Sequence, residues 1–384
     1  MILVFLFLLS AQSAHLVESV LAGAIVIPHG DFAFDSSLIP STQSEERFYA
    51  DKISIASRLA GNWFYDHLQP DIIFFSTPHG LKLDNDFAIF MGKKGQGTAL
   101  IGKDVTTKEK RLYNISLEVD LAQDVAMDLL SYLHYDQHRQ RSNVSGIFGF
   151  DDQRPMPLSW GEIIPLSMIF PSANNQGQGY PNQVYQKGHQ RQHSEIQPSR
   201  RKHTLRLLKK HQRSPIPVVI WSNPERRYDE APAMVPEILS LGAQIQKFIE
   251  DRPERIGVVI SADLSHTHLA DGPYGYSNAS GLFDSAVGKW AQDPCSVNGS
   301  ASLLTTCRKL QNDAKCCGFT GIVLLHGMIC PGFYQVVASS KMNVGSGPVE
   351  SRQDDHIRYK STLMANHNVT YYGMMAATFA RIQQ

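Results

Sequence analysis

Short, wholly apolar runs alternate along the chain with longer stretches in which apolar residues recur at helical spacing. Ala22–Pro28 is the first apolar run, and such an uninterrupted stretch is typical of a strand buried on both faces. The segment from Thr42 to Leu68 has helical spacing and begins with a possible capping box, Thr42-Gln-Ser-Glu45. Pro70 stops this pattern. The chain is therefore predicted to open with a buried strand followed by a long helix.

The same alternation continues to the middle of the chain and beyond. We predict further strands at Asp71–Thr77, Ile163–Phe170, Pro217–Trp221 and Gly257–Ser261, and further helices at Leu121–Leu133 and Met234–Glu250. Strand–helix alternation of this kind indicates an α/β fold with a mostly parallel or mixed central sheet covered by helices on both faces. At 384 residues, one large domain spanning 22–384 accounts for the pattern.

Composition narrows the class of protein. Lys+Arg and Asp+Glu are both 36, so the chain lacks the basic excess of a nucleic-acid-binding protein. Apolar residues make up 42 %, which is enough to build a sizeable core. Five cysteines are too few for a disulfide scaffold, and their odd number leaves at least one unpaired within the chain. No apolar run approaches the ~18–20 residues of a membrane helix, so no transmembrane segment is expected.

Two segments depart from the globular pattern. Residues 1–14 combine an apolar run, Ile2–Leu9, with small residues after it, as in a secretory signal peptide. The first basic residue is Arg47, however, so the charged start of such a signal is missing, and an N-terminal strand or a misassigned start codon is the alternative. Residues 172–214 are rich in Asn, Gln, Gly, Ser and His and carry a basic run. We interpret them as a solvated low-complexity insert, with an anionic partner as the alternative.

Five Asn-x-Ser/Thr sequons favour secretion, although one or two such triplets arise by chance in a chain of this length. They begin at Asn114, Asn143, Asn278, Asn298 and Asn368. Localisation stays open between the secretory pathway and the cytoplasm.

Histidines follow three of the predicted strands. His29 and His79 each lie in a Pro-His-Gly triplet just past an apolar strand, and His266 follows Gly257–Ser261 by a few residues. In α/β sheets, ligands bind at the carboxyl ends of the strands, where these imidazoles would converge. Neutral imidazole is the commonest protein metal ligand and a natural acid or base near neutral pH. The alternative is three ordinary loop histidines.

The ordered segments around these histidines resemble one known family, the LigB-type class III extradiol ring-cleavage dioxygenases, whose superfamily includes the Memo-like proteins. The resemblance runs through AIVIPHGD (24–31), DIIFFSTPHG (71–80), GVVISADLSHTH (257–268), DAKCCGFTGIVLLHGMI (313–329) and TYYGMMAATFA (370–380). It implies a LigB-like α/β fold and a non-haem ferrous iron. It also implies a reaction in which both atoms of O₂ enter a catechol-type or aminophenol-type ring.

Carried over by position, the resemblance implies that His29 and His79 bind the metal and that His266 is the catalytic acid/base. Asp263 either orients His266 or its loop, or is a turn residue. Ring-cleaving relatives commonly supply a Glu as third ligand in a stretch that here contains Cys316 and Cys317. Cys317 matches the cysteine position of Memo-like relatives. A thiolate ligand is softer than a carboxylate and would also admit copper or zinc; two buried structural cysteines are the alternative.

The substrate side departs from the family as well. Trp160 stands where many relatives carry a substrate-contacting histidine, and it can stack on an aromatic ring but cannot transfer a proton. The loop after His266 can bring Tyr274 or Tyr276 to the pocket, or expose both tyrosines in a surface turn. His326, inside an apolar run, is expected in the core.

Cys295, Cys307 and Cys330 are expected to be structural, and Cys295 and Cys307 could pair if the chain is secreted.

Two functions follow from the resemblance. The first is an Fe(II)-dependent extradiol dioxygenase acting on a small aromatic substrate and O₂. The second is a Memo-like metal-binding, redox or interaction protein of the same fold that does not cleave rings. A homo-oligomer is compatible with either function, since some relatives need a second subunit.

Overall fold

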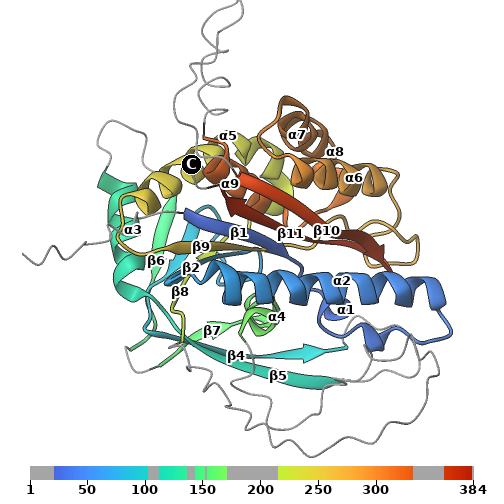
Figure 1. The fold of residues 1–384 in the computed structure, drawn as a ribbon, viewed down its shortest axis with the longest axis horizontal. Coiled ribbons are helices and arrows are strands. Elements are labelled where there is room, and N and C mark those ends of the chain that lie inside the picture. Colours follow the sequence, from blue (N-terminus) through green and yellow to red (C-terminus); the bar gives the residue numbers. More distant parts are fainter. Residues whose placement is uncertain are drawn as a thin grey trace, which may run out of the picture.

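An eight-stranded mixed sheet forms the centre of the molecule in the computed structural model, which describes residues 21–102, 112–135, 143–151, 154–170, 215–331 and 359–382. Figure 1 shows the sheet between two layers of helices. Across the sheet, the order is β10 (Tyr359–Val369), β11 (Tyr372–Arg381), β1 (Leu21–Ile27), β9 (Ile256–Ser261), β2 (Ile72–Thr77), β8 (Val218–Ser222), β3 (Phe87–Phe90) and β6 (Val144–Ile147).

The middle of this sheet is parallel. Strands β1, β9, β2 and β8 run side by side in one direction, with Val26 paired to Ile260 and Ser76 also paired to Ile260. β11 and β3 flank them in antiparallel orientation. Every residue of the four parallel strands is buried, as expected for strands covered on both faces. Their carboxyl ends therefore open at the same edge of the sheet.

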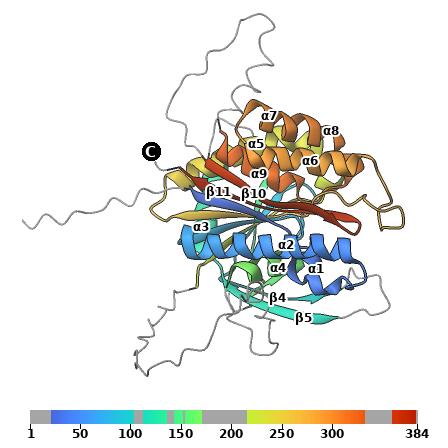
Figure 2. The ribbon, with the colours of Figure 1, turned by 45° about the vertical axis from the view of Figure 1, so that its right-hand side comes forward.

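Helices cover both faces, as Figures 1 and 2 show from two directions. One face packs against α3 (Gln123–Tyr135), α5 (Arg227–Glu250), α6 (Ala279–Gln292), α8 (Arg308–Ala314) and α9 (Phe319–Ile329). The other packs against α1 (Asp31–Phe34), α2 (Ser44–Asn62) and α4 (Trp160–Ile169). Beyond these lies a three-stranded sheet of β5 (Tyr113–Asp120), β4 (Lys94–Ile101) and β7 (Met156–Leu158).

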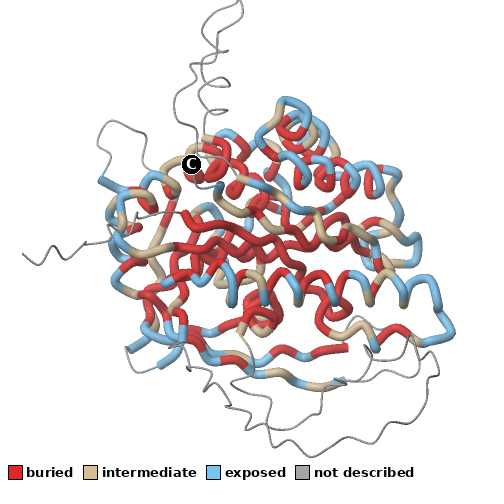
Figure 3. The backbone as a smooth tube through the Cα atoms, in the orientation of Figure 1, coloured by how far each residue is buried: buried red, intermediate tan, exposed pale blue. Residues whose placement is uncertain are grey.

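Neighbouring side chains of one strand point to opposite faces, so each strand contributes to two cores. Phe74 packs on the α5/α9 side and Phe75 on the α2/α4 side. Figure 3 shows the consequence, a continuous buried band through the sheet and the helix faces turned toward it. The predicted α/β class, with a mixed sheet covered on both faces, is confirmed.

Most predicted elements are present with small shifts. The strands at 22–28, 71–77, 217–221 and 257–261 correspond to β1, β2, β8 and β9, and the helix at 121–133 corresponds to α3. The helix at 234–250 is α5, which begins seven residues earlier at Arg227 and contains Pro232 and Pro236. Both prolines lie beyond the first four residues of the helix, so each removes one intrahelical N–H donor.

The long first helix is confirmed in extent, but not in its cap. α2 begins at Ser44 after Gln43, and no side chain caps it, so the predicted Thr42/Glu45 capping box is absent. The helix continues through a π-helical turn, Trp63–Leu68. Gln69 then takes a left-handed conformation with φ of 49°, and Pro70 follows. The stop is therefore where the proline predicts it.

The predicted strand at Ile163–Phe170 is wrong, because this segment is the helix α4. Ser159 and Glu162 form a capping box at its start: the Ser159 hydroxyl accepts from the helix backbone, and the Glu162 carboxyl accepts from the Ser159 N–H. The helix is apolar nearly all round because it lies between the two sheets, packing on both α2 and β4. When a segment is buried on all sides, its apolar residues show neither the helical nor the strand periodicity. The sequence therefore does not distinguish a short buried helix from a buried strand here.

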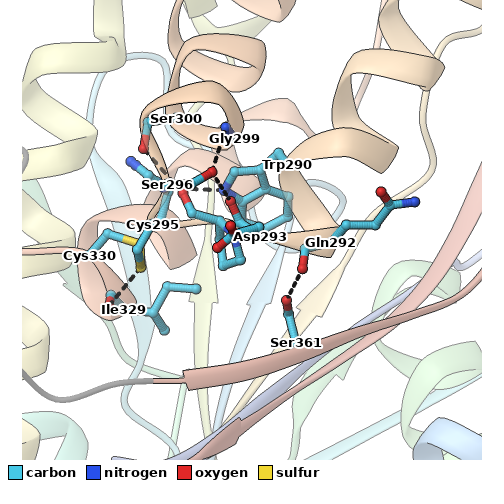
Figure 4. The surroundings of a disulfide bond; sticks show 12 residues. Trp290, Gln292, Asp293, Cys295, Ser296, Gly299, Ser300, Ile329, Cys330 and Ser361 are labelled. Atoms are coloured by element: carbon cyan, nitrogen blue, oxygen red, sulfur yellow. Dashed lines mark hydrogen bonds between the residues drawn. A yellow bond between two sulfur atoms is a disulfide. The ribbon is translucent and has the colours of Figure 1, made fainter.

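The proposed Cys295–Cys307 pair is also wrong. Cys295 is bonded to Cys330, with a Cα–Cα distance of 5.4 Å, and Cys307 is a buried free thiol. Figure 4 shows the bond, which ties the segment before α7 (Val297–Ala301) to the end of α9. His326 is fully buried in α9, as expected for a core histidine, and its Nδ1 accepts a hydrogen bond from Trp290 Nε1 at 3.1 Å.

Residues 1–14 and the 172–214 insert lie outside the described residues. None of the helices that the structure describes is both long enough and apolar enough to cross a bilayer.

Candidate metal centre

Three side chains with metal-binding atoms meet at the carboxyl edge of the parallel strands. His29 follows β1, His79 follows β2, and Cys317 lies two residues before α9. One ligand atom from each lies within 4.8 Å of the others, and within the described residues no other three His, Cys, Asp or Glu side chains form such a group. The two Pro-His-Gly triplets are therefore brought together as the sequence predicts. Cys317 completes a set of two imidazoles and one thiol.

Glycines beside the donors allow this close approach. A Cβ on Gly30 would lie 2.4 Å from the Tyr372 ring, and one on Gly80 would lie 2.7 Å from Ser222 Oγ. A Cβ on Gly318 would meet the Ala262 Cβ at 2.4 Å. Any side chain at Gly318 would push the start of α9, and Cys317 with it, away from β9. The glycines are thus explained by packing rather than by unusual backbone angles.

Hydrogen bonds select one tautomer of His29. The Ser261 hydroxyl donates its only proton to the Gly161 carbonyl at 2.6 Å, so it must accept from His29 Nδ1–H, 2.8 Å away. Nδ1 therefore carries the proton, and Nε2 has a lone pair. This is the arrangement of a metal-ligating histidine, whose other nitrogen donates to a fixed partner.

Burial holds His29 and His79 in the neutral form, which is the form that binds metal. It holds the Cys317 thiol in its protonated form. Burial, followed by the charges of His266 and Arg227, lowers the pKa of His29 to about 3. Burial and the charge of His29 lower the pKa of His79 well below its ordinary value. Burial raises the pKa of the Cys317 thiol, with the Asp263 carboxylate acting in the same direction. Metal uptake must therefore displace a proton from Cys317.

The spacing of His29 and Cys317 fits a shared ion. Cys317 Sγ lies 3.4 Å from His29 Nε2. A nitrogen at ~2.0–2.1 Å and a sulfur at ~2.3 Å from one tetrahedral ion would be about 3.5 Å apart. The widest separation in the group, up to 4.8 Å, has to close by roughly 1 Å for all three atoms to bind one ion. The residues present therefore fit a mononuclear site.

Asp263 borders the same site. Its Oδ1 accepts from the backbone N–H groups of His29 at 3.0 Å and Gly30 at 3.3 Å, and its Oδ2 lies 3.3 Å from His29 Nε2. With His29 neutral, this last contact is a carboxylate facing a lone pair rather than an ion pair. A cation between them would relieve the repulsion. Asp263 thus fixes the His29 turn, a contact that its position before His266 does not predict.

His266 lies beside the group and is held by its own loop. Its Nδ1 donates to the Leu264 carbonyl at 2.8 Å, so Nε2 is the ring nitrogen that carries the lone pair. Its ring stacks on Tyr372 with centroids 5.7 Å apart, and Tyr372 in turn packs on Gly30 next to His29. Burial lowers the pKa of His266 to about 4, so the imidazole is a neutral base at physiological pH.

The neighbouring His268 is engaged elsewhere. Its Nε2 lies 2.8 Å from Asp284 Oδ2 and 2.9 Å from Ser265 Oγ, and its backbone pairs with Tyr276. Of the two histidines in this loop, His266 is therefore the one whose Nε2 is suited to accept a proton.

Two of the three predicted substrate-contacting aromatics adjoin the site histidines. Trp160, which is 45 % exposed, lies over His79 with ring centroids 4.8 Å apart. Tyr274, which is 55 % exposed, meets His266 edge-on at 5.7 Å. The Tyr276 side chain is exposed on the loop. Trp160 and Tyr274 thus each contact a different histidine of the site.

Cys316 is not part of the donor group. Its thiol is buried and faces the Asp263 carbonyl at 3.4 Å, and burial raises its pKa well above the ordinary value. Of the two adjacent cysteines, only Cys317 is placed as a ligand.

Several residues that shape the site were not singled out from the sequence. Arg227 is buried and donates to the carbonyls of Pro78 and Pro224, which places the turn that carries His79. Ser159 Oγ donates to the His79 carbonyl. One feature of the sequence could have pointed to Ser261: it is a polar residue at the end of an apolar strand, two positions before Asp263. Arg227, in a run of charged residues, had no such feature.

Comparison with known proteins adds little to this picture. No protein-family model matches the chain, and no curated protein matches it. Among solved structures, one similar chain is described as uncharacterized protein JW3007 from Escherichia coli K12. It has 10 % sequence identity and a TM-score of 0.43, over 93 % of this chain and 99 % of that one. This level of similarity assigns neither a family nor a function.

Proposed function

We propose that the chain is a non-haem Fe(II)-dependent dioxygenase that opens a catechol-type or aminophenol-type ring with O₂. The observation that carries the proposal is the convergence of His29, His79 and Cys317 beside a neutral His266. The nature of the reaction rests on the resemblance of the same segments to extradiol dioxygenases. Both oxygen atoms enter the product in that chemistry, so no external reductant is required.

The chain's own residues suit the tasks that such a reaction sets. A ferrous ion would bind substrate and O₂ together and pass electrons from the aromatic substrate to O₂ in this chemistry. His29, His79 and Cys317 would hold the ion on one side, and a chelating substrate would bind on the other. His266 Nε2 would take a proton from a substrate hydroxyl and return it later. Trp160 beside His79 and Tyr274 beside His266 would supply aromatic contacts to such a substrate.

Cys317 favours a second candidate, a metal-binding or redox protein without ring cleavage. A thiolate donates more charge than a carboxylate and suits copper or zinc as well as iron. Such a centre could bind metal tightly and still fail to insert oxygen. The two candidate functions share the same metal ligands. They differ in that only the dioxygenase requires His266 to transfer a proton to and from a substrate.

Anaerobic reconstitution with Fe(II), followed by oxygen and a panel of catechols and 2-aminophenols, tests the proposal. The expected result is O₂ uptake matched by a yellow ring-opened product. His266→Gln, which keeps a hydrogen-bonding side chain but cannot titrate near neutral pH, should keep its iron and lose ~10²–10⁴-fold in turnover. Iron binding with no product from any substrate would favour the second candidate. Equal turnover in His266→Gln would remove His266 as the base.

A further inference from the structure

The five sequon asparagines share one structural property. Asn114, Asn143, Asn278, Asn298 and Asn368 are all exposed, whereas Asn223, which is not in a sequon, is buried. A glycan needs an asparagine amide that faces solvent, because the attached sugar cannot be accommodated in a packed core. One buried member would have excluded that position. None is excluded.

The disulfide points to the same compartment. Cys295–Cys330 is a structural bond, and such bonds persist where the surroundings are oxidising rather than in the reducing cytosol. The other three cysteines, Cys307, Cys316 and Cys317, are buried or half-buried, so none presents an exposed thiol to that environment. Cysteine placement and sequon placement are independent features of the chain, and both suit the secretory pathway.

We infer that the chain matures in the secretory pathway and carries N-linked glycans at three or more of these five asparagines. In the transfer step, Nδ2 of the asparagine forms a bond to C1 of the first sugar of a lipid-pyrophosphate-linked oligosaccharide. The bond from C1 to the phosphate oxygen breaks, the lipid pyrophosphate leaves, and Nδ2 loses one proton. Asn143 Nδ2 donates to Glu237 Oε1 at 2.9 Å, and the N–H that remains after transfer can keep that bond.

Three of the five positions lie at sheet edges. Asn114 is on β5, an edge of the three-stranded sheet. In the described part of the chain, β10 and β6 are the two edge strands of the eight-stranded sheet. Asn368 is on β10, and Asn143 directly precedes β6. Unpaired edge strands invite pairing with another chain, and bulky hydrophilic groups there oppose it. Glycans at Asn114, Asn143 and Asn368 would thus guard the molecule against edge-to-edge association.

The test uses the full 384-residue chain expressed in cultured animal cells. Peptide-N-glycosidase in H₂¹⁸O converts each glycosylated asparagine to ¹⁸O-labelled aspartate, which peptide mass spectrometry locates. Asn85 and Asn312, exposed but outside sequons, are the matched controls. Label at three or more of the five sequons, with none at the controls, supports the inference. Label at two or fewer overturns it, whatever the outcome of the metal and dioxygenase experiments.

A second measurement tests the role at the edges. Asn→Gln at Asn114, Asn143 and Asn368 should leave the thermal midpoint within a few degrees but raise light scattering on incubation at 37 °C. The matched variant carries Asn→Gln at the helix positions Asn278 and Asn298 and should scatter like the wild type. Equal scattering by the two variants would show that the edge glycans have no guarding role.

Discussion

At His326, burial of the imidazole makes the stability of the fold sensitive to acid. The ring is fully buried beside Trp290, and burial lowers its pKa from 6.5 to about 4. The unfolded chain therefore binds a proton between pH 6.5 and 4 that the folded chain does not. The free energy of unfolding falls as the pH falls through this window, by up to roughly 3 kcal/mol for this one group.

His326→Asn keeps an acceptor for Trp290 Nε1–H and cannot titrate. We expect denaturant unfolding at pH 6.5 and pH 4.5 to show a smaller acid loss in this variant than in the wild type. The other buried histidines are common to both proteins and cancel in the comparison. Equal acid losses would mean that His326 is not held neutral by the fold.

Individual residues were predictable from the sequence where a motif fixed their place. The Pro-His-Gly triplets placed His29 and His79 at strand ends because proline and glycine end an apolar strand wherever the rest of the chain lies. Asp263 was placed in the right loop, but its hydrogen bond from the His29 backbone was not foreseen. Its carboxylate turns toward the His29 backbone, a contact across more than two hundred residues that local spacing cannot reveal.

Between elements, one serine connects three of them to the metal centre. Ser261, at the end of β9, donates to the Gly161 carbonyl in α4 and accepts from His29 after β1. Pro165 contributes to this arrangement, because it lacks the N–H that would otherwise donate to the Gly161 carbonyl four residues earlier in the helix. Helix α4 thus orients a side chain on a strand, which in turn orients a metal ligand.

Ser261→Ala should lower metal affinity ~10–100-fold, since the His29 ring loses the partner that sets its tautomer. It should also cost about 1–3 kcal/mol of unfolding free energy through the unpaired Gly161 carbonyl. Ser76→Ala on the adjacent strand is the matched control, because its hydroxyl is equally buried and has no hydrogen-bond partner. Calorimetric metal titration of both variants is the measurement. Equal affinities in the two variants would refute the link.

Element types were predictable where the apolar pattern had a clear period or a firm stop. Helix α2 has one buried and one exposed face, and it and its π-helical extension stop before Pro70, so the span was predicted well. Helix α4 is buried on both sides, which erases the period, and its capping box at Ser159 and Glu162 was the only local signal of a helix. The short strands β3, β6 and β7 form by pairing with distant partners and have little signature of their own.

At the scale of the whole molecule, the disulfide fastens the helical layer at one end of the fold. Cys295 and Cys330 are 35 residues apart, and closing a loop of that length stabilises a fold by roughly 3–4 kcal/mol in the chain-entropy account. Replacing both by alanine should lower the thermal midpoint by several degrees. Reductant should lower the wild-type midpoint similarly and leave the double variant unchanged. A shift of the double variant on reduction would point to a different bond.

The architecture was predictable from the sequence because strand–helix alternation with fully apolar strands admits few folds. The disulfide pairing was not, because Cys307 is closer to Cys295 in sequence and only tertiary packing, such as the contact of Trp290 in α6 with His326 in α9, brings Cys330 within bonding distance. The third ligand was left between Cys316 and Cys317 for the same reason. One residue along the turn before α9 decides which thiol faces His29 and which faces the core.

The adjacent cysteines give the most direct test of the central claim that His29, His79 and Cys317 form a metal centre. The measurement is an anaerobic Co(II) titration of the wild type, Cys317→Ala and Cys316→Ala, following the sulfur-to-cobalt charge-transfer absorption. The wild type and Cys316→Ala should each bind one equivalent with this absorption, and Cys317→Ala should lose the absorption and most of the affinity. Charge-transfer absorption that survives in Cys317→Ala, or vanishes in Cys316→Ala, would contradict the account.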